Sequence, residues 1–280
     1  MAMDPQEKHV TVNGVRLRYL DWGSQGKMPL VCLHGHTGQA RIWDEFAEAV
    51  RSDYHVFTVD QRGHGESEWA ATGYDRDRFV EDLAAFADAL DLGRFVLVGL
   101  SMGGWHSMLY TPDHQDRVER IVIVDIAPEP SPEYMDQRAK RPPVPMEFPS
   151  LEAAVEWARQ DDPWATDTRI RRDTEDKTRQ REDGRWVWKA DPALFNKMLP
   201  DMTDPSHVAR YWRSFEAIEC PLLEVRGLES GLVSDETVRR MEQVGKRFSS
   251  VDVAGAGHIV TVDKPQEFIQ ATRGFLGVSG

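Results

Sequence analysis

Long apolar runs and cysteines are both scarce in this 280-residue sequence. No apolar run reaches the ~18 residues that a membrane-spanning helix needs. Two cysteines, Cys32 and Cys220, are too few for a disulfide framework or for a metal site of their own. Residues 1–10 include charges and a proline and lack the apolar stretch of a signal peptide. We therefore expect free thiols and a cytoplasmic location.

Positively charged residues are also few. Lys and Arg number 34 against 47 Asp and Glu, so the formal net charge is −13. Nucleic acids and anionic membrane surfaces attract clustered basic residues, and we expect neither as a partner. Disorder is excluded as a description of the whole chain, because 40% of the residues are hydrophobic and nine are tryptophan.

Short apolar runs alternate with amphipathic stretches over the first 126 residues. Asn13-Gly14 separates the first two runs and signals a two-residue β-hairpin turn. The later runs are nearly unbroken, as in parallel strands buried on both faces. They cover residues 30–33, 56–59, 95–100 and 121–126, and further strands are predicted at 222–225 and 250–253. This alternation predicts an α/β fold with helices on both sides of a parallel sheet.

The alternation stops at Pro128. Residues 128–149 contain seven prolines, which argue against a helix interior or a central strand there. A charged, helical stretch follows, and residues 128–215 hold five of the nine tryptophans. We therefore predict a core formed by residues 1–127 and 216–280, with residues 128–215 inserted between two strands of its sheet.

The run Gly99-Leu100-Ser101-Met102-Gly103-Gly104 matches the pattern G-x-S-x-G. It stands where a predicted strand ends and a predicted helix begins, the context in which such a serine lies on a sharp turn. Glycines are needed because the turn leaves no room for side chains. The hydroxyl of Ser101 would lie at the positive end of the following helix, so we predict Ser101 as a nucleophile.

A serine hydroxyl needs a base to remove its proton. His258 lies in the loop directly after the last predicted strand, and such loops gather at one edge of a parallel sheet. That edge is also the edge of Ser101, so His258 is the predicted base. His64, in a loop at the same edge, is the alternative.

A carboxylate should orient the imidazole, and its loss costs ~10⁴-fold in serine proteases. Asp125 follows a strand at the same edge and is favoured, with Glu229 and Asp235 as alternatives in the loop after the next strand. Two backbone N–H groups should stabilise the oxyanion. We assign these to Met102, directly after the nucleophile, and to His36, in the loop after residues 30–33.

Together these motifs resemble the α/β-hydrolase fold family. The resemblance extends over residues 8–276 and rests on His34-Gly35, Asp60-Gln61-Arg62-Gly63-His64-Gly65-Glu66-Ser67, the turn at Ser101 and Gly257-His258. It implies a mostly parallel eight-stranded sheet flanked by helices, and a mainly helical cap inserted after strand six. It also implies that no metal or cofactor is required. The family's chain order of nucleophile, acid and histidine is satisfied by Ser101, Asp125 and His258.

One position departs from the family's commonest pattern. Most members place the acid three residues after the glycine that ends strand seven, and Ser230 occupies that position here. Some members use a carboxylate after strand six, which Asp125 matches. The chain is therefore similar to the esterases, lactonases and enol-lactonases of that subgroup. Haloalkane dehalogenases and epoxide hydrolases have aspartate at the position of Ser101.

We predict a serine hydrolase of a small carboxylic ester or lactone that is neutral and partly aromatic or cyclic. Trp105, Trp186 and Trp188 are candidate substrate contacts, and packing of the cap on the core is their alternative role. The same triad could act on C–C, thioester or amide bonds or as a perhydrolase. A ligand-binding protein with little turnover is the alternative from another class. The sequence does not separate a monomer from a homodimer.

The negative charge is unevenly distributed. Residues 128–215 hold 17 acidic and 15 basic residues, a net charge of −2. The rest of the chain holds 30 and 19, a net charge of −11. A nearly neutral cap favours a neutral substrate over an ionic one.

Overall fold

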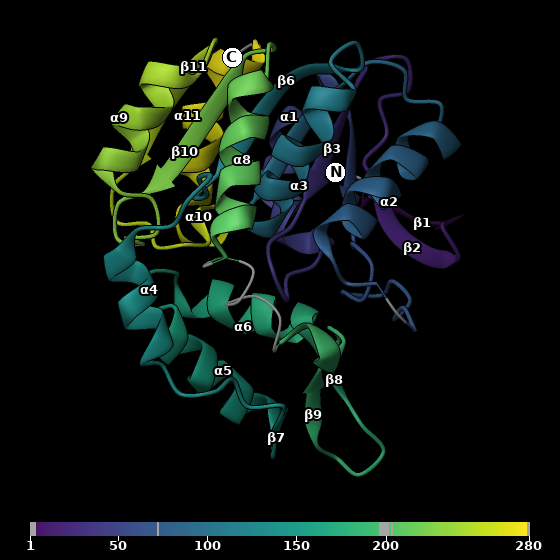
Figure 1. Ribbon diagram of the computed structural model, residues 1–280. Helices are drawn as coiled ribbons and strands as arrows, with labels where there is room; N and C mark the ends of the chain where they lie inside the picture. The colour runs from purple at the N-terminus through teal and green to yellow at the C-terminus, as the bar shows by residue number, and fades with distance from the viewer. Residues whose placement is uncertain (1–3, 72, 196–201, 203, 279–280) are drawn as a thin grey trace.

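An eight-stranded sheet forms the core of the computed structural model, which describes residues 4–71, 73–195, 202 and 204–278. The strand order is β1-β2-β4-β3-β5-β6-β10-β11 (Figure 1). The first two pairs are antiparallel, and the five others are parallel. The predicted fold class is confirmed.

The elements of the core agree closely with the predicted ones. The strands are β1 (Gln6–Val12), β2 (Val15–Asp21), β3 (Met28–Leu33), β4 (Tyr54–Val59), β5 (Phe95–Leu100), β6 (Val118–Val124), β10 (Leu222–Gly227) and β11 (Phe248–Val253). The α-helices are α1 (Asp44–Val50), α2 (Arg76–Ala89), α3 (Met102–Tyr110), α8 (Pro205–Ala217), α9 (Asp235–Val244), α10 (Val260–Asp263) and α11 (Pro265–Leu276).

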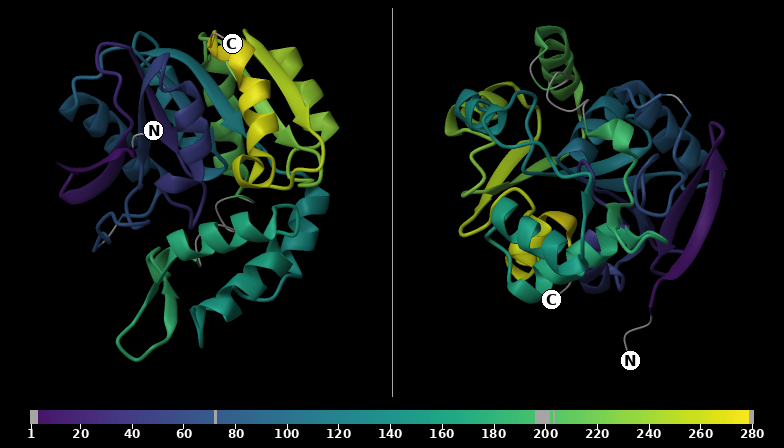
Figure 2. Two further views of the ribbon diagram at one scale, coloured as in Figure 1. Left: turned by 180° about the vertical axis from the view of Figure 1, so that it is seen from behind. Right: turned by 90° about the horizontal axis from the view of Figure 1, so that it is seen from below.

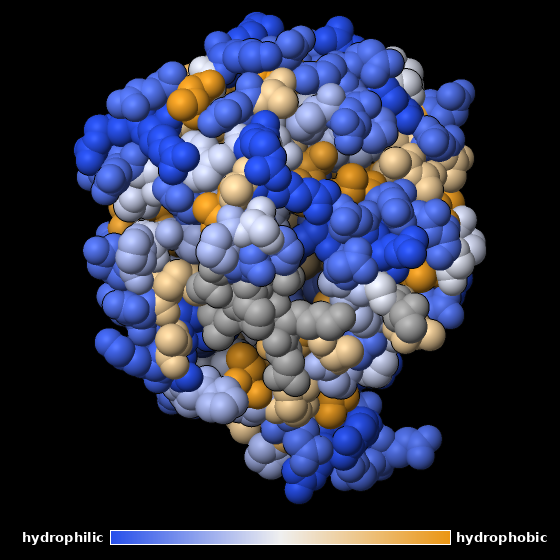
Figure 3. Space-filling view, in the orientation of Figure 1, coloured by the Kyte–Doolittle hydropathy of each residue, from blue (hydrophilic) through white to orange (hydrophobic). Residues whose placement is uncertain are grey.

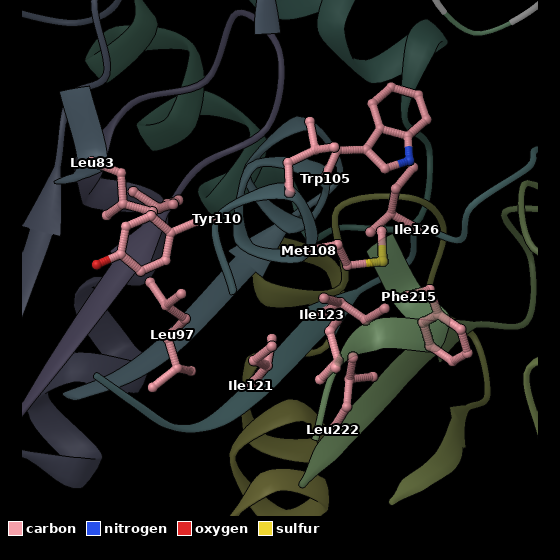
Figure 4. Close-up of a cluster of buried hydrophobic side chains, with 14 of the residues drawn as sticks. Leu83, Leu97, Trp105, Met108, Tyr110, Ile121, Ile123, Ile126, Phe215 and Leu222 are labelled. Atoms are coloured by element: carbon pink, nitrogen blue, oxygen red, sulfur yellow. The ribbon is translucent and has the colours of Figure 1, made fainter. Parts of the chain in front are cut away.

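Alternation along the central strands divides the core into two clusters, one on each face of the sheet. In β5, Phe95 and Leu97 belong to one cluster, and Val96 and Val98 belong to the other. Helices α2, α3, α8 and α9 cover the first face, part of which is drawn in Figure 4. Helices α1 and α11 cover the second face, which is turned toward the viewer in the left view of Figure 2. Burial of the sheet on both faces explains why its strands appear as nearly unbroken apolar runs.

A cap follows β6 and lies beside the carboxyl ends of the strands, below the core in Figure 1. It consists of α4 (Pro132–Ala139), α5 (Leu151–Asp161), α6 (Asp167–Lys177) and a small sheet of β7 (Glu147–Phe148), β8 (Thr178–Gln180) and β9 (Trp186–Trp188). The order in the small sheet is β7-β9-β8. Because β6 pairs directly with β10, the cap is inserted between neighbouring strands of the main sheet.

The structure departs from the predicted organisation at both ends of the insertion. The proline-rich segment contains helix α4, because Pro132 occupies the first helical turn, where the missing N–H is not needed. The hydroxyl of Ser131 caps this helix by accepting the Tyr134 N–H. The predicted boundary at residue 215 is also wrong, since α8 packs on α3 and its Phe215 belongs to the core cluster. An amphipathic helix does not indicate by its spacing which surface it covers.

Hydrophilic residues cover much of the face drawn in Figure 3, including the end of the β8–β9 hairpin. In the part of the chain that the structure describes, no helix is both long and apolar enough to cross a membrane. Cys32 and Cys220 are buried free thiols.

Candidate active site

The predicted nucleophile, acid and histidine lie at one edge of the sheet, at the ends of β5, β6 and β11. Backbone hydrogen bonds extend the strand pairing past the strand ends. The Ser101 N–H donates to the Val124 carbonyl at 2.9 Å, and the Asp125 N–H donates to the Val225 carbonyl at 2.9 Å. The register of the sheet therefore fixes the position of the acid relative to the nucleophile.

Ser101 lies on a strained turn. Its φ of +51° falls in the left-handed region, which is costly for a residue with a side chain. Helix α3 begins at Met102, so the N–H of Met102 has no partner within the helix. This N–H lies at the positive end of the helix dipole. Gly103 must lack a side chain, because a Cβ there would lie 2.2 Å from the Leu33 carbonyl oxygen. The first turn of α3 is thereby packed against the end of β3.

Asp125 is the carboxylate that the structure brings to His258. His258 Nδ1 lies 2.7 Å from Asp125 Oδ2, and the Asp125 side chain is fully buried while the imidazole is about one-third exposed (32%). The Gly227 N–H donates to Asp125 Oδ1 at 3.2 Å, and the Ser230 hydroxyl donates to Oδ2 at 2.5 Å. Both carboxylate oxygens are thus held, and the anchored Nδ1 leaves His258 Nε2 for proton transfer.

Neither alternative acid shares the contact that Asp125 makes with His258, although Glu229 lines the same cavity. Glu229 is exposed, and its backbone N–H donates to the Ala256 carbonyl. Asp235 forms a salt bridge of 2.6 Å with Arg226. Ser230, at the position where most relatives were expected to have the acid, instead donates a hydrogen bond to Asp125. This supporting hydroxyl was not predicted, since its value depends on the position of a residue 105 places earlier in the chain.

Strand β3 ends at Leu33, and the loop that follows it starts beside the predicted nucleophile. Gln61 holds this loop through two hydrogen bonds to His34: its N–H donates to Nε2 at 3.0 Å, and its side-chain amide donates to the carbonyl at 2.7 Å. His106 Nδ1 lies 2.6 Å from Gln61 Oε1 and completes the network. These contacts orient the backbone of residues 34–36, where the His36 N–H was predicted as an oxyanion donor.

The histidines of this network are neutral. Burial lowers the pKa of His34 to about 4 and the pKa of His36 to about 3. Burial also lowers the pKa of His64, the alternative base, to about 3. His64 has no exposed surface, and its Nδ1 lies 2.8 Å from the Arg62 carbonyl oxygen. It therefore faces the interior instead of the cavity that Ser101 and His258 line.

A second buried carboxyl lies next to Asp125 and was missed by the sequence analysis. Glu224, in the middle of β10, accepts the Ile126 N–H at 3.2 Å. Burial, followed by the nearby charge of Asp125, raises the pKa of Glu224 well above its usual range. The raised pKa of Glu224 favours its neutral form beside Asp125.

Comparison with known proteins now identifies the family. A family model described as alpha/beta hydrolase fold matches residues 28–228. The chain belongs to this family. It is 32% identical over 279 residues to a 3-hydroxybutyrate-oligomer hydrolase of Cupriavidus necator, covering 94% of this chain and 93% of the relative. It is 29% identical over 266 residues to esterase Rv0045c of Mycobacterium tuberculosis, covering 92% and 85%. The crystal structure of an alpha/beta hydrolase from Novosphingobium aromaticivorans is similar with a TM-score of 0.85, at 25% identity over 99% of each chain.

In this α/β hydrolase, the cap and core enclose a cavity of about 230 Å³ whose wall includes Ser101, Met102, His36 and His258. A cavity of this kind suits a small organic ligand. Five aromatic side chains from the cap also line the cavity. They are Tyr134, Trp157, Trp164, Trp188 and Phe195.

The three tryptophans predicted as substrate contacts differ in position. Trp188 lines the cavity, and its indole N–H donates to the Pro145 carbonyl at 2.7 Å. Trp186 packs against the cap cluster but is not part of the cavity wall. Trp105 reaches the wall from α3 but is only 2% exposed, and it stacks on Tyr211 with ring centroids 4.9 Å apart. Its main role in the structure is packing.

Four of the charged residues in the cavity wall form two pairs. Lys177 bonds to Asp173 at 2.5 Å, and Arg141 bonds to Asp161 at 3.3 Å. The described residues contain no group of three or more His, Cys, Asp or Glu side chains that could hold a metal ion. The cavity wall thus includes a serine at the start of a helix and a histidine that is bonded to a buried aspartate.

Proposed function

We propose that this α/β hydrolase is a serine esterase that cleaves carboxylic esters, including lactones, through an acyl-enzyme on Ser101. The proposal rests on one observation above all, the 2.7 Å contact between His258 Nδ1 and Asp125 Oδ2 in a cavity whose wall includes Ser101. The 3-hydroxybutyrate-oligomer hydrolase and the esterase, which are similar over most of the chain, add support for ester chemistry.

In the first half of the reaction, Ser101 Oγ attacks the ester carbonyl carbon while its proton moves to His258 Nε2. Asp125 accepts a hydrogen bond from the Nδ1–H of His258 and stabilises the imidazolium that forms. The backbone N–H groups of Met102 and His36 donate to the carbonyl oxygen as it becomes negative. The C–O bond then breaks, and His258 gives its proton to the leaving alcohol.

In the second half, water attacks the acyl-enzyme and passes a proton to His258. The bond between the acyl carbon and Ser101 Oγ breaks, and His258 returns the proton to the serine. The products are an acid and the free enzyme. Every proton transfer uses the one imidazole, whose orientation Asp125 maintains.

A neutral substrate is supported by the charge pairing in the cavity wall. The pairs Lys177–Asp173 and Arg141–Asp161 cancel their own charges. Trp188 adds an apolar aromatic surface against which a ring could pack. We therefore propose a small, partly aromatic or cyclic ester as the first candidate.

An ester with a free carboxylate is the second candidate, favoured by Arg138 of α4. Arg138 lines the cavity and forms no salt bridge with any residue that the structure describes. It lies near the oxyanion loop, since its positive charge contributes to the lowered pKa of His36. An oligomer of 3-hydroxybutyrate, the substrate in the name of the relative from Cupriavidus necator, ends in such a carboxylate.

The test compares the wild type with Ser101→Ala on p-nitrophenyl acyl esters, lactones, thioesters and a 3-hydroxybutyrate oligomer. We expect ester turnover to fall by roughly 10⁴- to 10⁶-fold in the variant. Equal turnover by the two proteins would refute the proposal. If turnover is confined to thioesters, amides or C–C bonds, or to perhydrolysis, that reaction would be assigned to the triad instead. Saturable binding without turnover would favour a receptor.

A further inference from the structure

The loop of the proposed catalytic histidine is enclosed from two sides at Gly257, the residue before His258. On the core side, the end of β10 lies against its carbonyl group, since a Cβ at Gly227 would be 2.0 Å from the Gly257 carbonyl oxygen. On the cap side, the ring of Trp164 lies against its Cα, since a Cβ at Gly257 would be 2.3 Å from Trp164 Cδ1. The three heavy atoms nearest to that Cβ position all belong to Trp164. Gly257 is therefore packed between a core strand and a cap ring.

Hydrogen bonds hold the same loop from the core. Asp263, the last residue of α10, accepts the N–H of Gly257 on its Oδ2 at 2.8 Å. The carbonyl of Ala256 accepts the N–H of Glu229, in the loop after β10, at 2.9 Å. Both partners belong to the core, whereas Trp164 belongs to the cap. The contact between Trp164 and Gly257 is thus a separate support, which the cap adds to those of the core.

The turn that carries Trp164, between α5 and α6, is itself anchored on the core. Ala165, the next residue, packs against the core cluster that contains Ala256 and Val260. Further along, Arg169 of α6 forms a salt bridge of 2.7 Å with Glu45 of α1, and the Arg169 side chain is mostly buried. These contacts fix the ring of Trp164 relative to the core. The ring can therefore act as a rigid stop for the histidine loop.

The position of this loop matters for the proposed proton transfers. The imidazole of His258 is held at Nδ1 by Asp125, at 2.7 Å, so a shift of the backbone at residues 257–258 would tilt the ring about that contact. Its Nε2 would then move relative to Ser101, which lines the same cavity. A misplacement of about 1 Å at a reacting group can cost about 100-fold in rate. A ring that prevents such a shift therefore contributes to turnover.

We propose that Trp164 is a positioning residue by which the cap holds the loop of His258 in the geometry that proton transfer requires. The inference rests on the proposed ester hydrolysis, in which His258 is the base. Trp164 acts through Gly257, so it is a positioning residue and not a catalytic one. In addition to enclosing the substrate, the cap thereby takes part in aligning the triad.

The test is a double-variant cycle of Gly257→Ala and Trp164→Ala, measured as kcat and KM on one p-nitrophenyl ester. The φ of Gly257 is not in the left-handed region, so alanine adds a Cβ there without backbone strain. That Cβ must displace either the ring or the loop. We expect each single variant to lower kcat by roughly 10- to 100-fold. The double variant should match Trp164→Ala within about threefold, because both changes break the same contact.

Two outcomes of this cycle would overturn the proposal. If the two losses multiply in the double variant, the residues act independently of each other. If Trp164→Ala keeps the kcat of the wild type and only raises KM, Trp164 serves as cavity wall alone. Trp164→Phe keeps a ring at Gly257 and should recover most of kcat. Because Trp164 is 41% exposed, its truncation empties no core, and thermal unfolding verifies that each variant is folded.

Trp69→Ala is the matched control, because Trp69 is also an exposed indole (40%) that joins the core to the cap. Its N–H donates to the carbonyl of Lys189, directly after β9, at 2.9 Å, and it is not part of the cavity wall. Trp69→Ala should leave kcat within about twofold of the wild type and should not restore Gly257→Ala. An equal loss of kcat in Trp69→Ala and Trp164→Ala would mean that any loosening of the cap has this effect, and the proposal would fail.

The labelling rate with a fluorophosphonate separates this proposal from the proposed function. Ser101 Oγ bonds to phosphorus, fluoride leaves, and His258 takes the serine proton, so labelling needs the aligned pair but no ester. The labelling rates should follow the same cycle as kcat. If Ser101 of the wild type is labelled but no ester is cleaved, the proposed function alone is refuted, and the labelling rates still test Trp164. If esters are cleaved and Trp164→Ala is labelled at the wild-type rate, the positioning role alone is refuted.

Discussion

At the scale of single residues, Asp125 explains most of the candidate site. Its φ of +46° places the carboxylate at the edge of the sheet, where it accepts from Gly227, Ser230 and His258. Burial raises the pKa of the neighbouring Glu224, which favours its neutral form. Asp125 was favoured from the sequence because it ends a strand. The contact of the Ser230 hydroxyl and the raised pKa of Glu224 depend on neighbours that are distant in the sequence.

Removing the charge of Asp125 provides the sharpest test at this scale. Asp125→Asn should lower kcat by about 10³- to 10⁴-fold, because the imidazole loses the partner that fixes its tautomer and stabilises its cation. Glu229→Gln is the control and should change kcat by less than about threefold, since Glu229 is exposed and does not bond to His258. Steady-state kinetics on one ester measures both variants. The reverse result would assign the acid to Glu229.

At the scale of elements, strand β9 determines how the cap meets the cavity. In an extended strand, Trp186 and Trp188 lie on the same face. Burial nevertheless differs along the strand, since Trp188 is 7% exposed and packs against Phe148 and Trp157, while Trp186 is half-buried. The cavity wall therefore includes one ring and not the other.

This difference predicts unequal effects of truncation. Trp188→Ala should lower the free energy of unfolding by about 3–5 kcal/mol and raise KM, because it opens a hole in the cap cluster and in the cavity wall. Trp186→Ala should lower stability by less and leave KM within about twofold of the wild type. Thermal unfolding and steady-state kinetics measure the two effects. A larger rise of KM for Trp186→Ala would place the substrate against the other ring.

At the scale of the whole molecule, charged residues connect the two parts of the chain. Arg169 of the cap bonds to Glu45 at 2.7 Å, and Arg172 bonds to Asp44 at 2.5 Å. Both acids belong to α1 of the core, whose part of the chain holds most of the net charge of −13. The excess of acids in the core thus provides partners for cap arginines, in addition to acting as surface charge.

The pH dependence of folding is also a property of the whole molecule. Four histidines (His34, His36, His64 and His106) have pKa values that burial lowers. Between about pH 6.5 and pH 4 the unfolded chain binds protons that these folded histidines do not, so stability is present above pH 6.5 and lost as the pH falls. Buried or half-buried carboxyls with raised pKa values have the opposite sign, and they are Asp44, Asp60, Asp162, Asp176, Glu224 and Asp263.

We therefore expect protonation of these histidines in the unfolded chain to lower the free energy of unfolding from pH 7 to pH 5. Urea unfolding at the two pH values measures the decrease. His106→Gln keeps a donor for Gln61 and cannot be protonated, so its decrease should be smaller than that of the wild type even if the variant is less stable overall. An equal or larger decrease in the variant would show that His106 does not contribute.

Much of the fold could be predicted because its signals are local. The apolar runs matched the strands, and the glycine-rich turn at Ser101 was placed at the junction of β5 and α3. The end of the cap was misplaced because α8 carries the same mixture of charge and amphipathic spacing as the cap helices. Its assignment to the core depends on contacts with α3, which lies about 100 residues earlier in the chain.

The amino-acid sequence by itself determined the strand–turn–helix at Ser101, the loop of His258 and the end of the strand at Asp125. Each follows from the stereochemistry of a few adjacent residues and from the rule that parallel strands end at a common edge. Only the tertiary structure decided which groups support them. The hydrogen bond from Ser230 to Asp125 and the raised pKa of Glu224 both depend on burial next to a partner on another element. Burial and proximity are properties of the packed chain, so no local pattern encodes them.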